Sequence, residues 1–523
     1  MFYVVQSGTT LKKMSPSGTV TALTLPTGVD IASAKRLRGA VLNNQVVLVY
    51  SPSANLTIDA FNTVRPMELT PPGAAATVST AAGGTLSGSF KVKQTFFIKD
   101  QNGNVLVESD FGPASATVSP SAQWITVVPV KSAQTVSGTR LYRTTTGPGS
   151  TYFPWIDIEG NEGSTFRDDL SDAGLQLVAA PTDLGTSPKF SNIVEWKERL
   201  WGVPEEEFDS LWQSALNKAG SWPRSRTILI PPKQNDDRGI TGLLRRKDEL
   251  GVGRADRLFK IVGTSESNFT RQSVSNEVGI WATDSVSVAH DIGYFLGNPF
   301  GIYSWGPSGV KNISDEKVKA WFSTDTYFNR SRFEYAYGCY DPIQHAYICL
   351  LSAAGSTDLD RWIQYNIATD TWWGPHKTGA FTPTGCVTFR NSNNVLLPII
   401  FASDGKLYQP QTTKTDGSST AIDFDVESNW MSGGTPDIFK TWLDPSIVTE
   451  IQSAGTLTVT PRIGERNASA GSAISHDMTL GSQRLRRLGN GKFAQFRFRE
   501  NTAGQDVTLY GFEVPFIENG RRS

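Results

Sequence analysis

Short runs in which apolar and polar residues alternate recur along the chain and end at turn-forming residues. Residues 40–50 place Asn43 and Asn44 between two apolar runs, and asparagine tolerates the positive φ that a two-residue hairpin turn requires. Residues 10–20 alternate in the same way and turn at residues 16–18. Because the apolar period is two residues rather than about 3.6, these stretches predict β-strands joined by tight turns.

The same rhythm returns after residue 185, as units of a strand, a turn, a strand rich in Tyr or Trp, and a further turn. Equivalent points in these units lie roughly 35–50 residues apart, the spacing expected of propeller blades. Residues 1–65 and 186–412 together supply about 290 residues, enough for six or seven four-stranded blades. We therefore predict a β-propeller-like body, with a pair of β-sandwiches as the alternative.

Two further β regions accompany this body. Residues 66–185 open with a double proline and an Ala/Thr/Gly/Ser tract to residue 89, which reads as a linker or a loosely ordered edge. About seven strand signals in the region predict a small β-sandwich inserted into the propeller. A polar tract near residue 412 marks a boundary, and residues 413–523 predict a C-terminal β domain. The fold class is thus all-β.

Composition agrees with this prediction and narrows the chemistry. Charged residues make up 19% of the chain against a usual ~25%, while 48 glycines and 28 prolines supply turns. The formal net charge of -1 gives no global attraction to nucleic acid. Cys339, Cys349 and Cys386 are too few for a disulfide framework and predict buried free thiols. No apolar run is long enough to span a membrane, so no stable membrane insertion is expected.

Candidate catalytic and metal-binding residues do not form a specific pattern. The histidines lie more than thirty residues apart, although distant residues can converge across a propeller: His290, His345, His376 and His476. The turn that begins at Asp100 imitates a calcium loop but has Phe111 where a bidentate glutamate is required. Asp168 and Asp169 are neighbours on one predicted strand and so point to opposite faces. We predict no catalytic residues, no metal site, no cofactor and no enzymatic activity.

Tryptophan is abundant, with 14 residues, and could stack on sugars. Most of these residues, such as Trp201, Trp305 and Trp373, lie in strand-like runs and are predicted to be core.

The strongest charge feature is a basic cluster in the last domain: Arg484, Arg486, Arg487, Lys492, Arg497 and Arg499. On a strand, Arg497 and Arg499 share one face, while Phe496 and Phe498 share the other. Three interpretations stay open for this cluster: a solvated face paired with nearby acids, a subunit interface, or a surface that meets DNA phosphates.

Three regions, taken in order, resemble the tail nozzle (tail hub) proteins of short-tailed bacteriophages. Residues 197–203, 211–214 and 220–222 resemble one blade of that family, and residues 292–305 resemble another. The predicted strand at residues 139–144 is similar to the fibronectin-type module that these proteins carry between early blades. Residues 440–443, 484–498, 509–513 and 520–522 resemble the family's closing β domain.

The resemblance implies a structural component of the virion tail, made in the host cytoplasm. It implies a hexameric ring of identical subunits below the head–tail adaptor protein, in contact with tail fibre, spike or needle proteins. Genomic DNA would cross its lumen during ejection without sequence-specific binding. The alternative function is a glycan-binding or glycan-degrading propeller that acts at the host cell surface, with a cellular interaction module ranked last.

Overall fold

The computed structural model describes residues 2–31, 36–147, 149–175, 178–233, 238–377, 381–410, 413, 415–416, 420–486 and 488–519. Among these residues the elements are almost all β-strands, and the single α-helix is α1 (Lys319–Ser323). The chain divides into two compact units, one of Met1–Thr357, Ile363–Gly374 and Val387–Leu397, the other of Asp358–Trp362, Pro375–Cys386 and Pro398–Ser523. The all-β prediction is confirmed.

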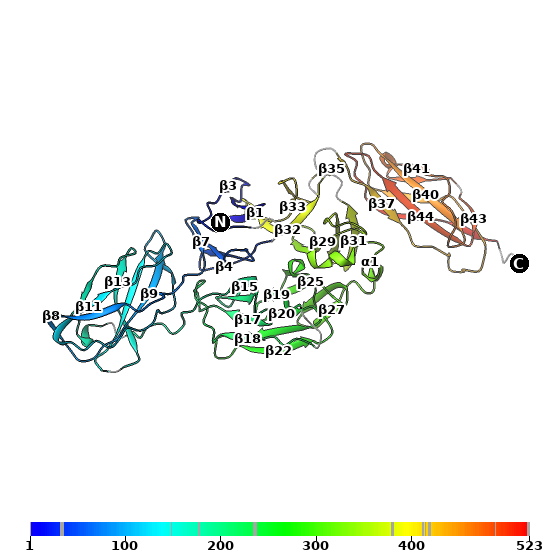
Figure 1. Ribbon diagram of the computed structural model, residues 1–523. Coiled ribbons are helices and arrows are strands. Elements are labelled where there is room, and N and C mark those ends of the chain that lie inside the picture. Colours follow the sequence, from blue (N-terminus) through cyan, green and yellow to red (C-terminus); the bar gives the residue numbers. More distant parts are fainter. Residues whose placement is uncertain are drawn as a thin grey trace. The chain divides into compact units, whose positions relative to one another are not determined.

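The propeller-like body consists of seven small antiparallel sheets that follow one another in chain order, here called blades 1 to 7 (Figure 1). Blade 1 holds β1 (Tyr3–Ser7), β2 (Thr10–Met14) and β3 (Val20–Ala22). Blade 2 holds β4 (Arg38–Leu42), β5 (Gln45–Val49), β6 (Leu56–Ile58) and β7 (Val64–Pro66). Blade 3 holds β15 (Phe190–Trp196), β16 (Arg199–Pro204), β17 (Ser210–Gln213) and β18 (Thr227–Leu229). Blade 4 holds β19 (Ile240–Arg245), β20 (Leu250–Arg254), β21 (Leu258–Val262) and β22 (Thr270–Ser275).

The remaining blades complete the series. Blade 5 holds β23 (Gly279–Ile280), β24 (Ser287–Ala289), β25 (Ile292–Asn298), β26 (Gly301–Gly306) and β27 (Gly309–Asn312). Blade 6 holds β28 (Tyr337–Asp341), β29 (Ala346–Leu351), β30 (Arg361–Asn366) and β31 (Thr371–Lys377). Blade 7 holds β32 (Pro383–Arg390), β33 (Leu396–Ala402) and β34 (Leu407–Tyr408). Seven blades agree with the predicted six or seven.

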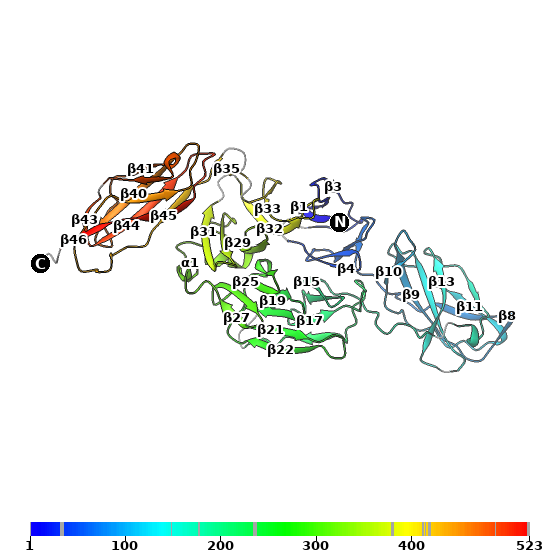
Figure 2. The ribbon, with the colours of Figure 1, turned by 180° about the vertical axis from the view of Figure 1, so that it is seen from behind.

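Contacts between the first and last blades close the ring. The ring of Tyr3 in β1 lies 4.4 Å, centroid to centroid, from that of Phe389 in β32. The Tyr3 hydroxyl donates to the carbonyl of Arg390, and the Ser392 amide donates to the carbonyl of Pro16. Each sheet is too small to bury its own apolar face, so every blade depends on two neighbours. Figure 2 shows the blades from behind.

Three blades share the same tight turn between their first long strands. Asn43 and Asn44 in blade 2 have φ values of 46° and 59°, as the sequence predicted for a hairpin. Lys197 and Glu198 occupy the corresponding positions of blade 3 (53° and 58°). His290 and Asp291 occupy those of blade 5 (52° and 62°). The three turns therefore have the same left-handed backbone conformation at two successive residues, although the residues differ.

The insert is a seven-stranded β-sandwich, as predicted (Figure 1, blue to cyan). One sheet holds β10 (Val105–Glu108), β9 (Val92–Lys99), β12 (Gly138–Thr144) and β13 (Tyr152–Glu159), and the other holds β14 (Phe166–Asp168), β11 (Ser121–Val128) and β8 (Thr77–Ser87). Its own core includes Phe90, Ile125 and Leu141, all buried. The insert therefore has the features of an independent domain.

The Ala/Thr/Gly/Ser tract is a regular edge strand rather than a linker. β8 pairs antiparallel with β11 over most of its length, with Trp124 opposite Ala81 and Ile125 opposite Thr80. Most of its side chains are exposed, so it shows little apolar alternation in sequence. At Gly84 a Cβ atom would lie 2.2 Å from the backbone nitrogen of Trp124, so a glycine is required there.

Buried Asn55 joins the two ends of the insert. Its backbone carbonyl accepts from the Met67 amide, where the chain leaves blade 2. Its side-chain amide donates to the carbonyl of Pro188 (2.6 Å) and accepts from the Phe190 amide (3.1 Å), where the chain returns to blade 3. The insertion thus begins and ends at one point of the ring.

In the described part of the C-terminal region, a two-stranded sheet of β35 (Thr415–Asp416) and β36 (Thr420–Ala421) precedes three sheets that share one core. The first holds β37 (Phe424–Glu427), β44 (Phe493–Glu500), β40 (Thr456–Gly464) and β41 (Ile474–Asp477); the second holds β43 (Gly489–Gly491), β38 (Lys440–Trp442) and β46 (Phe516–Glu518); the third holds β42 (Ser482–Arg484), β39 (Ser446–Thr449) and β45 (Leu509–Glu513). Trp442, Phe496 and Phe498 lie in the core. A C-terminal β domain was predicted, and these sheets lie inside its range.

Most aromatic and thiol side chains meet the sequence expectation. The three cysteines are buried, and burial raises the pKa of Cys349 to about 12. Trp201 and Trp305 are core residues. The prediction for Trp373 was wrong, since this side chain is 42% exposed on β31.

The left-handed turn of blade 3 provides a stability test. A non-glycine residue in this conformation costs about 1 kcal/mol or more, so Glu198→Gly should raise the free energy of unfolding by about that amount. The substitution removes only an exposed hydrogen bond from Asn217 to the Glu198 carboxylate. Glu206→Gly, at an exposed position without a positive φ, is the matched control and should not raise the free energy of unfolding. Equal denaturant midpoints for both variants would contradict the assignment.

Candidate functional site

Arg38 crosses the centre of the ring. It begins β4 in blade 2, and its Nε donates to Oδ1 of Asp284 in blade 5 at 2.8 Å. Its Nη1 also donates to the carbonyl of Ser191 in blade 3 (2.8 Å). Burial lowers the pKa of Arg38, but the Asp284 carboxylate outweighs burial and leaves the pKa raised. Arg38 therefore stays charged at every physiological pH.

Arg36 adds a second link at the same place. Its Nη1 lies 3.6 Å from Oδ2 of Asp284 and donates to the carbonyl of Tyr335, just before blade 6. Single side chains thus span the axis from blade 2 to blades 5 and 6.

Polar contacts also join adjacent blades at their first turns. Lys197 in blade 3 faces Asp248 in blade 4 at 3.5 Å, an exposed pair. The Asp291 carboxylate of blade 5 accepts from the Lys247 amide of blade 4 (2.7 Å), and Arg246 donates to the Asp291 carbonyl (2.8 Å). These contacts hold neighbouring turns together.

Two histidines converge on one tyrosine at the next junction. Nε2 of His290 lies 3.0 Å from the Tyr340 hydroxyl, and Nδ1 of His345 lies 3.2 Å from the same oxygen. Burial and the neighbouring Asp341 raise the pKa of Tyr340. Sequence spacing does not reveal which histidines meet, because His290 and His345 belong to turns of different blades. The described residues hold no group of three His, Cys, Asp or Glu side chains arranged to bind a metal.

The structure places Arg497 and Arg499 on β44, opposite acidic residues on β37 and just before it. Arg497 forms a two-pronged ion pair with Asp425, and this hydrogen bond lowers the pKa of Asp425. Arg499 donates to Asp423 through Nε (3.2 Å) and Nη2 (3.3 Å). As the alternation predicted, Phe496 and Phe498 on the other face of the strand lie in the core. The two strongest members of the basic cluster are therefore neutralised within their own sheet.

The other cluster residues lie on different elements. Arg484 is on β42 and faces Asp444 at 3.8 Å. Lys492 faces Glu465 at 3.2 Å. Arg486 is exposed, and Arg487 lies outside the described residues, as do Arg521 and Arg522. Among the described members of the cluster, Arg484, Lys492, Arg497 and Arg499 each have an acidic partner.

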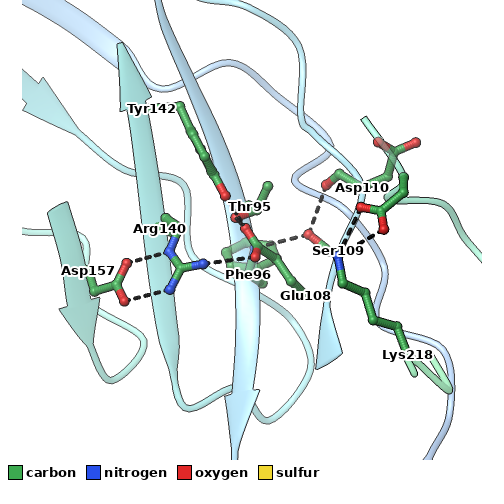
Figure 3. A network of polar contacts seen from close by, with 10 residues as sticks. Thr95, Phe96, Glu108, Ser109, Asp110, Arg140, Tyr142, Asp157 and Lys218 are labelled. Atoms are coloured by element: carbon green, nitrogen blue, oxygen red, sulfur yellow. Dashed lines mark hydrogen bonds and ion pairs between the residues drawn. The ribbon is translucent and has the colours of Figure 1, made fainter. Parts of the chain in front are cut away.

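Polar side chains in the insert form a network around Glu108 of β10 (Figure 3). Glu108 accepts from Thr95, Tyr142 and Arg140, and Arg140 also grips Asp157 of β13 with Nε (2.6 Å) and Nη2 (2.8 Å). Burial and the adjacent Glu108 raise the pKa of Tyr142. The network ties all four strands of one sheet and leaves no carboxylate oxygen directed at an empty site, so we assign it a structural role.

The two acidic candidates are also structural. Asp100 accepts the backbone amides of Asn102 and Asn104, both at 2.8 Å, which is the geometry of an Asx turn. Asp168 is fully buried against Arg143 (2.9 Å), while Asp169 accepts from the Thr85 amide on another strand. They do not form a carboxylate pair. In the described part of the chain, no helix is long and apolar enough to cross a membrane.

Comparison with known proteins identifies no family. No protein-family description and no curated protein sequence matches the chain. Solved structures that align with it include the extracellular domain of a putative one component system from B. thetaiotaomicron (9% identity, 97% of this chain and 77% of that one, TM-score 0.26). Others are PorZ of Porphyromonas gingivalis (7%, 99% and 80%, 0.27) and an exo-beta-1,3-galactanase from Phanerochaete chrysosporium (9%, 98% and 95%, 0.18). TM-scores this low carry no argument about function.

The axial ion pair predicts a large effect of one substitution. Asp284→Asn leaves Arg38 partly buried and without its counter-charge, so the free energy of unfolding should fall by about 3 kcal/mol. Asp248→Asn, which removes the partner of Lys197 at a 74% exposed position, is the control and should change it by less than about 0.5 kcal/mol. Chemical denaturation of both variants gives the comparison. If the two lose the same stability, the pair does not anchor the ring.

His376 in the second unit predicts a pH dependence of stability. Its ring packs edge-on against Trp362. Burial lowers the pKa of His376 to about 4, below its ordinary value of about 6.5. The unfolded chain therefore binds the proton more readily, and the stabilisation by the neutral ring is complete above about pH 6.5 and is lost as the pH falls toward 4.

Wild-type protein should lose this stability on acidification, whereas His376→Gln should not. The measurement is the free energy of unfolding of both proteins between pH 7 and pH 4. The exposed His345→Gln variant controls for general acid effects. Parallel pH profiles for wild type and His376→Gln would contradict the assignment.

Proposed function

We propose that this protein is a structural subunit of a bacteriophage tail, assembled as a ring of six copies below the head–tail adaptor protein. The observation that carries the proposal is the order of parts: two blades, an inserted seven-stranded sandwich, five further blades and a C-terminal β domain. That order is the one expected from the resemblance to tail nozzle proteins. Arrangement of this kind is a fold-level analogy and needs its own test.

The bridged axis supports a multi-subunit ring over a single-chain channel. Because Arg38 and Asp284 meet across the propeller, DNA in transit would pass between copies and not through one chain. The paired β37–β44 face fits the same role, since free arginines along a conduit would hold phosphates and slow ejection. These charges are consistent with passage without sequence-specific binding.

Exposed apolar side chains at one end of β42-β39-β45 support an assembled state. Ile451, Leu480 and Tyr510 are respectively 72%, 56% and 67% exposed. The Thr449 amide donates to the Gly481 carbonyl, and Thr449 pairs with Leu509, so the three side chains belong to adjoining strand ends. Apolar exposure of this kind is typical of contact surfaces, and we assign it to the neighbouring copy.

The test is assembly with the proteins encoded beside this chain. Co-expression with a neighbouring adaptor should give a closed ring of six copies by electron microscopy and mass measurement, and the same chain should be present in purified virions. Ile451→Lys should weaken the ring, whereas Ile343→Lys, at a 50% exposed turn position of blade 6, should not. Absence from virions together with a monomer in every mixture would refute the proposal. Release of reducing sugar from host polysaccharide would instead favour the glycan-degrading alternative.

A further inference from the structure

A polar pocket of about 490 Å³ opens on blades 3 and 4, next to the segment that returns from the insert. Gln213 of β17 and Arg226 line it on blade 3, and Glu266 and Phe269 line it on blade 4. Thr182 of the returning segment completes it. Its volume lies in the range of about 300–1,000 Å³ that holds small ligands. None of the functions discussed so far uses it.

The pocket carries more positive than negative charge. Arg226 Nη2 lies 2.6 Å from Oε2 of Glu266, and Nη2 of buried Arg199 lies 3.5 Å from the same oxygen. Burial and the adjacent Arg226 lower the pKa of Arg199. The next carboxylate, Asp183, is already held by Lys218 at 2.9 Å. Two guanidiniums therefore share one carboxylate, which leaves room for a single further negative charge.

Two polar atoms at the pocket lack a hydrogen-bond partner. Gln213 is only 4% exposed, and its Oε1 is buried and unpaired. Nη1 of Arg226 is buried and unpaired as well. Buried groups in this condition are rare in native proteins and need an explanation. Both atoms are covered in this structure, so a small turn of either side chain toward the pocket would let a polar ligand supply the missing acceptor for Arg226 and the missing donor for Gln213.

The pocket also has an aromatic wall. Phe269 packs against Trp196 and Trp201, with ring centroids 5.6 and 5.1 Å apart, so its position is fixed. An aromatic ring beside amide, hydroxyl and guanidinium groups suits a ligand that has both an apolar face and several hydroxyls. Inorganic phosphate has no apolar face to lie against Phe269.

We propose that this pocket binds an acidic sugar of the hexuronate class, with its carboxylate on Arg226 and its ring against Phe269, while the nearby Arg199 adds positive charge. Gln213 and the hydroxyl of Thr182 take ring hydroxyls. The ligand would be one unit of an anionic polysaccharide. The inference does not depend on the tail role: a binding pocket on the outer part of two blades requires neither a ring nor catalysis.

Titration of the full chain with oligogalacturonate tests the proposal, followed by calorimetry and by the fluorescence of the tryptophans behind Phe269. Galactose oligomers and inorganic phosphate serve as parallel probes. Oligogalacturonate should bind and the galactose oligomers should not. Arg226→Gln should weaken binding about tenfold or more, because a charged hydrogen-bond pair is lost. Arg224→Gln, two residues away, 80% exposed and paired with Glu207, should leave it unchanged.

A second variant keeps the test decisive if Arg226→Gln does not fold. Glu266 is largely exposed, and Glu266→Gln frees both guanidiniums, so oligogalacturonate should bind more tightly to it than to wild type. No binding of oligogalacturonate at millimolar concentration would overturn the inference. Equal binding of galactose oligomers would refute the role of charge, and equal binding of phosphate would reduce the pocket to an anion site.

Discussion

Closure of the ring is the constraint on which the propeller-like body depends. A four-stranded blade exposes two apolar faces, and each becomes core only when the adjacent blade covers it. Blades in mid-chain find both neighbours nearby in sequence, but blades 1 and 7 must find each other. The contact of Tyr3 with Phe389 and Arg390 supplies that last interface, and Arg38 with Asp284 fixes the opposite sides of the ring at its centre.

The charged residues are used mainly inside the molecule. Arg38, Arg143, Arg140 and Arg497 each meet at least one carboxylate, on the axis, in the insert or on the C-terminal sheet. Because the net charge of the chain is near zero, these ion pairs orient the strands that they join and add little to the electrostatic potential at the surface. The pocket of Arg199 and Arg226 differs because its positive charges exceed its single carboxylate.

The sequence predicted the fold better than the site. Strand period and turn chemistry revealed the blades, the Asn43–Asn44 turn and the inserted sandwich, because these features are local. β8 was read as a linker or a loosely ordered edge, because an exposed edge strand of Ala, Thr, Gly and Ser owes its order to backbone pairing with β11. Trp373 shows that a tryptophan in a strand need not be core.

The candidate site was harder to predict because it depends on distant residues. Nothing in the sequence connects Arg38 with Asp284, His290 with His345, or Gln213 with Glu266, since only the ring brings those segments together. For the basic cluster, strand alternation predicted that Arg497 and Arg499 lie on one face, but it did not predict their acidic partners Asp425 and Asp423.

Asn55 has a consequence for how the chain folds. The first and last blades meet across 387 residues of sequence, a separation that makes ring closure slow. Because Asn55 holds Met67, Pro188 and Phe190 at one point, a folded insert acts as a short connection, and its residues no longer lengthen the loop. Early folding of the insert would therefore bring blades 2 and 3 into register while the later blades are still being synthesised. One buried asparagine would then set the order of assembly.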